Sequence, residues 1–194
     1  MNYLAHIYLS GDNELVKIGN FMADGIRGKH YETLHPDIQK GVLLHREIDM
    51  FTDQHPVFRK GTKRLHERYH HYSGVIMDIF YDHFLSKNWQ KYSPEKLGSF
   101  IDNFYDSLER NYDQLTEKTK GMMPYMIKYN WLWSYQFPEG IQRILTQMDQ
   151  RSRTESNMRF ASEELSKYYT LFEQEFTEFF EDLRAHAAKT LAGL

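Results

Sequence analysis

Two stretches of the chain decide the fold, IQKGVLLHREIDMFT (residues 38–52) and VIMDIFYDHFLSKNW (residues 75–89). Apolar residues recur in both at spacings of three and four, and ionisable pairs occupy the same stripes, His45 with Asp49 in the first and Asp78 with Asp82 in the second. Residues with this spacing lie on one face of an α-helix. Because buried charge is costly unless it is paired or binds a metal, the two stripes predict helices that build a polar site between them.

Helical periodicity continues through the rest of the chain. One stripe runs through residues 97–115, and the longest, through residues 158–183, predicts an amphipathic core helix. Breaks are expected at residues 25–36, 73–74, 93–94, 121–124 and 138–140, and Ser93-Pro94-Glu95 resembles an N-cap with proline at the first helical position. No alternating strand pattern is present. We therefore expect one all-α domain over residues 1–194, a bundle of about seven helices.

Composition narrows the class of protein further. The 194 residues, 41% hydrophobic and 26% charged, are typical of a globular protein with one substantial core, and the net charge of −3 argues against bulk nucleic-acid binding. No apolar run is long enough to span a membrane, and the first residues do not resemble a signal peptide, so we expect a cytoplasmic protein without a membrane partner. The absence of cysteine excludes disulfides, thiolate nucleophiles and cysteine-ligated metals.

The ionisable residues form a set suited to a divalent metal. Besides the two pairs, Asp24 lies in a glycine-bounded segment (residues 19–28), His83 follows Asp82, and His6 lies in a short apolar opening helix. Carboxylate oxygens suit Mg²⁺ and Mn²⁺, and Mn²⁺ also accepts imidazole. Such a metal activates water and cancels charge in phosphate-ester hydrolysis. Taken singly, each residue has a structural alternative, such as a hydrogen-bonded core histidine for His6.

A second metal pattern competes with the first. Glu32 with His35, and Glu67 with His70, have the Glu-x-x-His spacing of helical di-iron bundles. Glu67 and His70 lie in a densely polar stretch, Glu32 to His35 runs into Pro36, and no further pair of inward glutamates is evident. We therefore favour the first set.

Residues 55–71 form a basic stretch in a chain that is acidic overall. Lys60, Lys63 and Arg64 share a helical face, with Arg59 beside them. A solvated surface is the usual meaning of such a run, but its single sign makes an acidic partner plausible. RNA is a further candidate, without a recognisable motif to support it. The aromatic-rich residues 125–137 are expected in the core, with a channel for a thin, flexible ligand as the alternative.

Four motifs together resemble the acyl carrier protein phosphodiesterase family. They are Met1-Asn2-Tyr3-Leu4-Ala5-His6, the segment Gly19-Asn20-Phe21-Met22-Ala23-Asp24 with Arg27-Gly28, the segment Gly41–Asp49 with Thr52-Asp53, and Asp78–Leu85. Weaker support comes from Trp133-Ser134 and Ile141-Gln142. The motifs cover about the first half of the chain. The family is distantly similar to the all-helical HD-type metal phosphohydrolases, although this chain has no adjacent His-Asp dipeptide.

The resemblance implies a metal-dependent phosphodiesterase, using Mn²⁺ with Mg²⁺ as the alternative, that releases 4′-phosphopantetheine from holo acyl carrier protein. On this hypothesis Asp24, His45, Asp49, Asp78 and Asp82 hold the metal, Arg27 and Arg46 neutralise phosphate oxygens, and His6 or His83 protonates the leaving oxygen. Arg59, Lys60, Lys63 and Arg64 would bind the acidic carrier protein. Two alternatives stay open: a helical phosphohydrolase acting on a small phosphate ester or nucleotide, and a non-catalytic adaptor for an acidic protein. The number of metals and the oligomeric state stay open as well.

Overall fold

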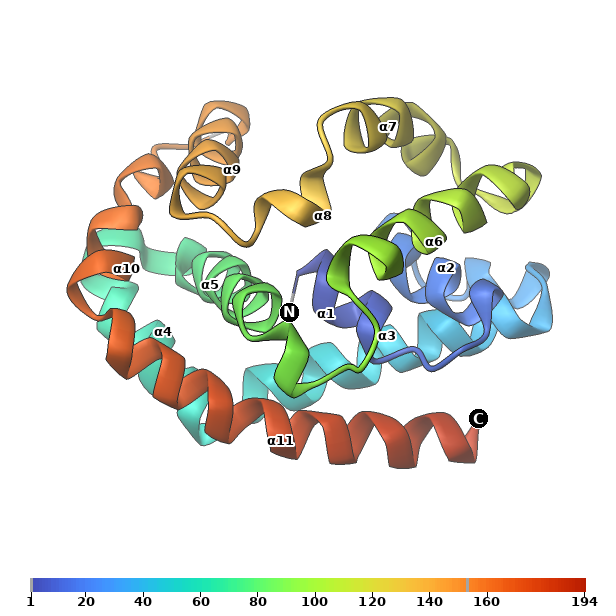
Figure 1. Cartoon of the computed structure of the whole chain (residues 1–194), viewed down its shortest axis with the longest axis horizontal. Coiled ribbons are helices and arrows are strands. Elements are labelled where there is room, and N and C mark those ends of the chain that lie inside the picture. Colours follow the sequence, from blue (N-terminus) through green and yellow to red (C-terminus); the bar gives the residue numbers. More distant parts are fainter. Residues whose placement is uncertain (1, 153) are drawn as a thin grey trace.

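The computed structural model describes residues 2–152 and 154–194, and every regular element in them is helical (Figure 1). Met1, the first residue of the opening motif, is outside this range. The all-α prediction is confirmed, but the described residues form eleven α-helices rather than about seven. The α-helices are α1 (Tyr3–Tyr8), α2 (Glu14–Met22), α3 (Pro36–Gln54), α4 (Pro56–Tyr69), α5 (Ser73–Lys87), α6 (Leu97–Arg110), α7 (Glu117–Lys128), α8 (Trp131–Ser134), α9 (Pro138–Arg151), α10 (Ser162–Lys167) and α11 (Tyr169–Gly193). Short 3-10 turns are η1 (Ala23–Gly25), η2 (His30–Thr33), η3 (His70–Tyr72), η4 (Trp89–Lys91), η5 (Tyr112–Gln114) and η6 (Met158–Phe160).

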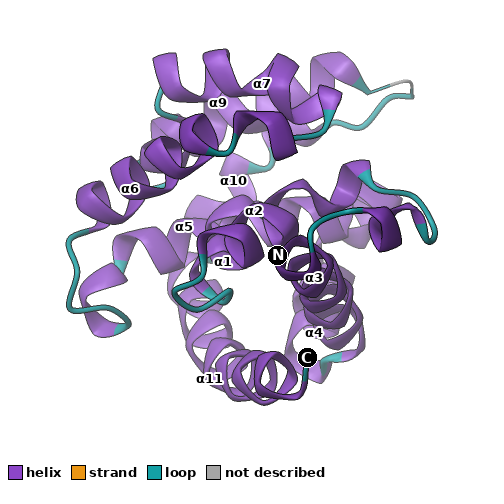
Figure 2. Cartoon of the chain, turned by 90° about the vertical axis from the view of Figure 1, so that its right-hand side faces the viewer, coloured by secondary structure: helices purple, strands orange, loops and turns teal. Residues whose placement is uncertain are grey.

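The helices form two layers that share one core. Helix α11 packs along α3, α4 and α5, while α6 to α9 lie above α1 and α5 in both views (Figures 1 and 2). Apolar side chains from both layers, such as Ile48, Phe80, Ile101 and Phe176, belong to the same buried cluster. One continuous core agrees with a single domain. No helix in the described part of the chain is long and apolar enough to cross a membrane.

The ends of α3 follow from its prolines. Pro36 occupies the first turn, and the His35 side chain accepts a hydrogen bond from the backbone N–H of Asp37. Pro56 disfavours helical backbone at the preceding residue, so His55 is extended and α3 ends at Gln54. Within this span the predicted stripe is buried at Ile38, Val42, His45 and Thr52, as expected for an inward face.

Three local predictions are wrong. Helix α6 begins at Leu97, because Ser93 Oγ accepts from the N–H of Glu95 in a turn that precedes the helix. Helix α7 continues through Gly121 and Pro124, since loss of the single N–H at proline does not end a helix held at its N-terminus by the Thr116 side chain. The long stripe is split at Ala161 and Tyr168 into η6, α10 and α11, although its apolar members other than the half-buried Tyr168 remain buried.

Two glycines position the site by letting α2 and α3 touch. A β-carbon built on Gly19 would lie 2.3 Å from the carbonyl oxygen of Ile38, and one on Gly41 would lie 2.2 Å from that of Val16. No other residue fits where two backbones approach so closely. The contact places Asn20, the neighbour of Gly19, against the face of α3 that presents His45.

Candidate metal centre

His6, His45 and Asp49 meet where α1, α2 and α3 converge. One ligand atom from each residue lies within 4.8 Å of the other two, the only such acidic and histidine group in the described residues. His6 Nε2 is 3.2 Å from Asp49 Oδ1, and His45 Nε2 is 3.0 Å from Asp49 Oδ2. The imidazole rings stack with centroids 4.1 Å apart. Both histidines are buried, whereas the Asp49 side chain is 42% exposed, so the group opens to solvent on its carboxylate side.

Asn20 fixes the orientation of both imidazoles. Its Nδ2 donates to the carbonyl oxygen of His6 (3.0 Å) and to Ser10 Oγ (2.9 Å), so its Oδ1 must face the rings. That oxygen is 2.7 Å from His6 Nδ1 and 3.2 Å from His45 Nδ1. An amide oxygen only accepts, so Nδ1 of each ring is the donor and Nε2 of each ring points at Asp49. Histidines that bind a metal in proteins usually donate a hydrogen bond from the other ring nitrogen to an acceptor of this kind.

The charges of the group favour a cation. Burial lowers the pKa of His6 to about 4, so its ring is neutral and its Nε2 lone pair faces a carboxylate oxygen. Burial on its own would also lower the pKa of His45, but hydrogen bonds to Asp24 and Asp49 outweigh it and raise that pKa to about 9. Burial alone would raise the pKa of Asp49, but its contacts with His45 and His6 hold that pKa far below its usual range. The His45 Nε2–H therefore donates to the carboxylates of Asp24 and Asp49, and its loss would leave acceptor atoms of three residues about 3 Å apart, an arrangement that a divalent metal would stabilise in place of the proton.

Asp24 adds a second carboxylate at the edge of this group. Its Oδ1 is 3.3 Å from His45 Nε2, and the side chain is 62% exposed. The hydrogen bond to His45 lowers the pKa of Asp24. Arg46 holds the loop that follows: its Nη2 donates to the carbonyl oxygens of Gly28 (2.6 Å) and Ile26 (3.4 Å), and its guanidinium lies over the Tyr31 ring. Arg46 therefore positions the loop, whereas Arg27 is exposed.

The residues predicted on α5 are placed differently from those on α3. Asp82 is fully buried, and its carboxylate accepts from the backbone N–H groups of Leu4 (2.8 Å) and Ala5 (3.2 Å), so it anchors the first turn of α1. Burial raises the pKa of Asp78, and the negative charge of Asp49 raises it further. Neither residue belongs to the three-residue group. Asp82 affects that group indirectly, because it fixes the position of α1, and α1 carries His6.

Asp82 should make folding stability depend on pH. Burial raises its pKa from 3.8 to about 7, which means that the folded state favours the protonated carboxyl. The resulting stabilisation is complete below about pH 4 and is lost as the pH rises through about 7, so the free energy of unfolding should fall by about 2–4 kcal/mol across this window. Urea unfolding at a series of pH values measures the effect, and the Asp82→Asn variant should remove it. The same substitution at Asp106, exposed on α6, is the control; an identical pH slope in the parent and Asp82→Asn would contradict the assignment.

His83 lies away from the centre. Its Nδ1 is 2.7 Å from the carbonyl oxygen of Tyr135, so Nδ1 donates and Nε2 accepts from the Tyr169 hydroxyl at 2.8 Å. Burial lowers the pKa of His83, which agrees with a neutral ring. Both nitrogens thus connect α5 to α8–α9 and α11, and the structure does not bring His83 to Asp49.

The basic stretch forms α4, and half of its predicted docking set is neutralised within the protein. Arg64 donates two hydrogen bonds of 2.8 Å to Glu175 of α11, a carboxylate only 6% exposed, and Lys60 lies 3.8 Å from the same carboxylate. Arg59 and Lys63 are exposed, and no ion pair of theirs is recorded in the described residues. The face available to an acidic partner is therefore smaller than the sequence pattern predicts.

Substitutions in α4 should separate the structural from the exposed cations. Arg64→Met leaves the Glu175 charge buried without its partner and should lower the free energy of unfolding by about 3–5 kcal/mol. Lys63→Met, on the same helix but exposed, should change it by less than about 0.5 kcal/mol. Urea denaturation measures both, and equal effects of the two substitutions would show that the Arg64–Glu175 pair does not stabilise the fold.

The di-iron pattern is not assembled. Glu32, His35, Glu67 and His70 are all exposed, and none of them joins a group of ligands within the described part of the chain. The two motifs lie on different elements, η2 with the residue before α3 and the end of α4.

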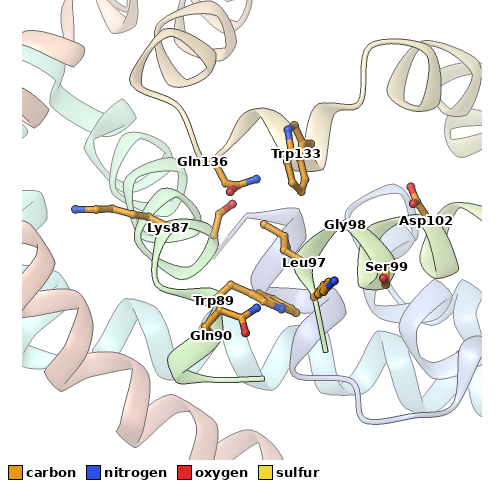
Figure 3. Close-up of a pocket in the computed structure, with 11 residues that line it drawn as sticks. Lys87, Trp89, Gln90, Leu97, Gly98, Ser99, Asp102, Trp133 and Gln136 are labelled. Atoms are coloured by element: carbon orange, nitrogen blue, oxygen red, sulfur yellow. The ribbon is translucent and has the colours of Figure 1, made fainter. Parts of the chain in front are cut away.

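Two hollows lie near these elements, and neither is lined by His6, His45 or Asp49. The first, of about 500 Å³, lies between the end of α5, α6 and α8 and is lined by polar residues such as Lys87, Asp102 and Gln136 (Figure 3). No member of the His–Asp group lines it. The second, of about 930 Å³, lies beneath α7, α8 and α9 and includes Asn2 and Tyr3, one helical turn before His6.

The structure thus defines an all-α protein in which a histidine–carboxylate group, His6, His45 and Asp49, could hold a metal ion. The model of the family described as acyl carrier protein phosphodiesterase matches residues 1–183, and the chain belongs to this family. Acyl carrier protein phosphodiesterases of Photorhabdus laumondii and Shigella boydii are each 29% identical to it, over 93% and 97% of this chain and 91% and 98% of their own lengths. The protein of that name from Escherichia coli O157:H7 is 28% identical over 97% of this chain and 98% of its own. No solved structure matches, so the HD-like detail remains a prediction.

Proposed function

We propose that this protein is a metal-dependent phosphodiesterase that removes 4′-phosphopantetheine from holo acyl carrier protein and leaves the apo carrier. Family membership supports the phosphodiester bond and the carrier as the substrate. The observation that supports a metal is the convergence of His6 Nε2, His45 Nε2 and Asp49, with Asn20 accepting from the opposite nitrogen of each ring.

The donor set indicates which ion would fit. Two imidazoles and a carboxylate suit a transition metal such as Mn²⁺ better than Mg²⁺, which prefers oxygen ligands only. His6, His45 and Asp49 would hold the ion, with Asp24 at its open side. A divalent ion in that position supplies a Lewis acid for the phosphoryl oxygens and lowers the pKa of water at the site.

The chain's own residues hold this arrangement. Asn20, oriented by Ser10, keeps Nδ1 of both imidazoles as the donor. Asp82 fixes the start of α1 and hence the position of His6. Arg46 holds the loop of Asp24 by two carbonyl oxygens. His83 is bound between Tyr135 and Tyr169, so we do not place it at the leaving oxygen. Arg59 and Lys63 are the exposed cations that we propose contact the acidic carrier, and the expected cytoplasmic location stays a prediction.

Incubation with holo acyl carrier protein tests the proposal. After exhaustive chelation the protein should leave the carrier mass unchanged, and added Mn²⁺ should restore loss of the phosphopantetheine mass, with Mg²⁺ less effective. Mass spectrometry of the carrier measures the product. Complete conversion by protein shown to be free of metal would rule out metal dependence, and an unchanged carrier with every added metal would rule out the substrate.

A further inference from the structure

The cavity of about 930 Å³ beneath α7, α8 and α9 lies beside the metal centre, although none of His6, His45 and Asp49 lines it. Its floor includes Asn2 and Tyr3, and the backbone carbonyl of Asn2 accepts from the N–H of His6. The Tyr3 hydroxyl contacts Met122 Sδ of α7 at 3.8 Å, so α1 and α7 meet inside the cavity. On the other side, Lys118 of α7 lies within 3.6 Å of the β-carbon position of Gly25, the neighbour of Asp24. The cavity therefore adjoins the first turn of α1, which precedes His6, and, through Lys118, the loop beside Asp24.

The walls of the cavity are apolar and adaptable. Three methionines, Met122, Met148 and Met158, line it together with Val75 and Ile144. Methionine side chains are flexible and accommodate apolar ligands of different shape. The volume is in the range of about 300–1,000 Å³ that small-molecule sites occupy. Tyr125 and Tyr129 stand at the wall although they are 59% and 60% exposed, so aromatic surface is presented to a ligand rather than buried in the core.

Cations occur at the polar parts of this wall. Lys118 lies beside the loop of Asp24, and Arg143 and Arg151 of α9 line the cavity as well. A ligand that fits is anionic where it meets the metal centre and uncharged and partly apolar along the rest of its length. A nucleotide or sugar phosphate would leave the methionine-rich part without a matching group.

We infer that this cavity binds the pantetheine arm of the carrier protein, with the phosphodiester at the His6–His45–Asp49 end and the sulfur end, with any thioester-linked chain, among Met148, Met158 and Ile144. The inference rests on the proposed function and adds to it the site at which the pantetheine arm binds. It also gives Lys118 a position at the phosphate end, which sequence reasoning missed because Lys118 is 94 positions from Asp24 in a segment without a motif. The aromatic residues 125–137, expected in the core, supply part of this wall through Tyr125, Tyr129 and Trp131.

Gly121 provides a direct test. It lines the cavity from α7, and no atom lies within 4 Å of a β-carbon placed on it, so a side chain there enters the cavity without displacing backbone. Gly121→Trp should fill the site, while Gly121→Ala adds one carbon and is the matched control. Gln147→Trp, at an exposed position of α9 on the same cavity, is the second filling variant should the first not fold. Circular dichroism checks the fold of each.

The probe is decanoyl-pantetheine, which lacks the phosphate, with pantetheine as its shorter analogue. Titration calorimetry should show the decanoyl compound binding to the parent, to Gly121→Ala and to Asp49→Ala, and binding to Gly121→Trp and Gln147→Trp weaker by about tenfold or more. With holo carrier the filling variants should raise KM with kcat little changed, the pattern expected when an interaction equal in the ground and transition states is lost.

The outcomes separate this inference from the proposed function. Parent-like binding and turnover in both filling variants, in a chain that cleaves holo carrier, would overturn the cavity assignment and leave the function intact. Weakened binding of decanoyl-pantetheine in both, in a chain that does not cleave holo carrier, would support the cavity and overturn the function.

Discussion

Replacing Asp49 by alanine is expected to reduce cleavage of holo acyl carrier protein by at least about 10³-fold, since a metal supplies several kcal/mol of charge stabilisation and each 1.4 kcal/mol is tenfold in rate. Asp49 is the residue that both imidazoles face, at 3.2 Å and 3.0 Å. Without this carboxylate, His45 Nε2 still has the exposed Asp24 Oδ1 at 3.3 Å, but the oxygens that both Nε2 atoms face are gone. The fold should persist, because the 42% exposure of Asp49 allows water to screen its charge and limits its contribution to stability to about 1 kcal/mol.

Two further substitutions make this test specific. Asp49→Asn keeps the shape but replaces one ligand oxygen with a donor that repels a cation, so it should lose activity as Asp49→Ala does. Asp53→Ala removes an exposed carboxylate one turn later on α3 and should be close to the parent. Turnover is measured by the carrier mass and bound Mn²⁺ by elemental analysis. Parent-like turnover in Asp49→Ala would remove this residue from the mechanism and with it the proposed centre.

The half of the site on α3 could be predicted because its determinants are local. Spacing places His45 and Asp49 on one helical face, and their mutual contact is an i, i+4 pair. The same spacing argument predicts that Asp82 points inward, and Asp82 is buried. Periodicity does not say, however, which other element a helical face packs against. Asp82 meets the N-terminus of α1, 77 and 78 residues away in sequence, where backbone N–H groups need an acceptor. His83 likewise meets Tyr135 and Tyr169.

The partner of Arg64 in the basic stretch could not be predicted for a related reason. Charge patterning correctly shows cations along α4, but Arg64 is neutralised by Glu175, 111 residues later on α11. Glu175 is three residues after Phe172 and four before Phe179, so its spacing agrees with burial, but spacing does not say which cation it meets. Ion pairs between distant helices follow from tertiary packing, and a single sequence does not contain that information.

The fold class could be predicted with more success than the helix boundaries. Apolar stripes identify helices because burial of one face drives their packing. Boundaries depend on single capping bonds and on neighbours, which is why Pro124 lies inside α7 and Ser93 outside α6. Asn20 had a visible signal: it follows Gly19 inside an apolar segment, and a fully buried amide in such a place must satisfy four hydrogen-bonding sites.

Asn20 is the second position where a large effect is expected. Asn20→Ala removes the acceptor of both Nδ1–H groups and the donor to the His6 carbonyl oxygen and Ser10 Oγ. Buried polar groups left without partners cost about 1–3 kcal/mol each, so the free energy of unfolding should fall by about 3 kcal/mol. Loss of the group behind a ligating imidazole typically weakens metal binding by about 10–100-fold.

The two effects have different readouts, which separates positioning from mere stability. Thermal unfolding without metal gives the first, and Mn²⁺ titration at a temperature where the variant is folded gives the second. Asn103→Ala removes one exposed amide hydrogen bond to Glu95 and should change neither. Asn20→Asp keeps an acceptor for both rings but turns a carboxylate oxygen toward the His6 carbonyl oxygen, so it should be destabilised yet bind Mn²⁺ more tightly than Asn20→Ala. Parent-like Mn²⁺ affinity in folded Asn20→Ala would mean that the stacked histidines do not need a fixed tautomer, and the case for His6 and His45 as ligands would fall.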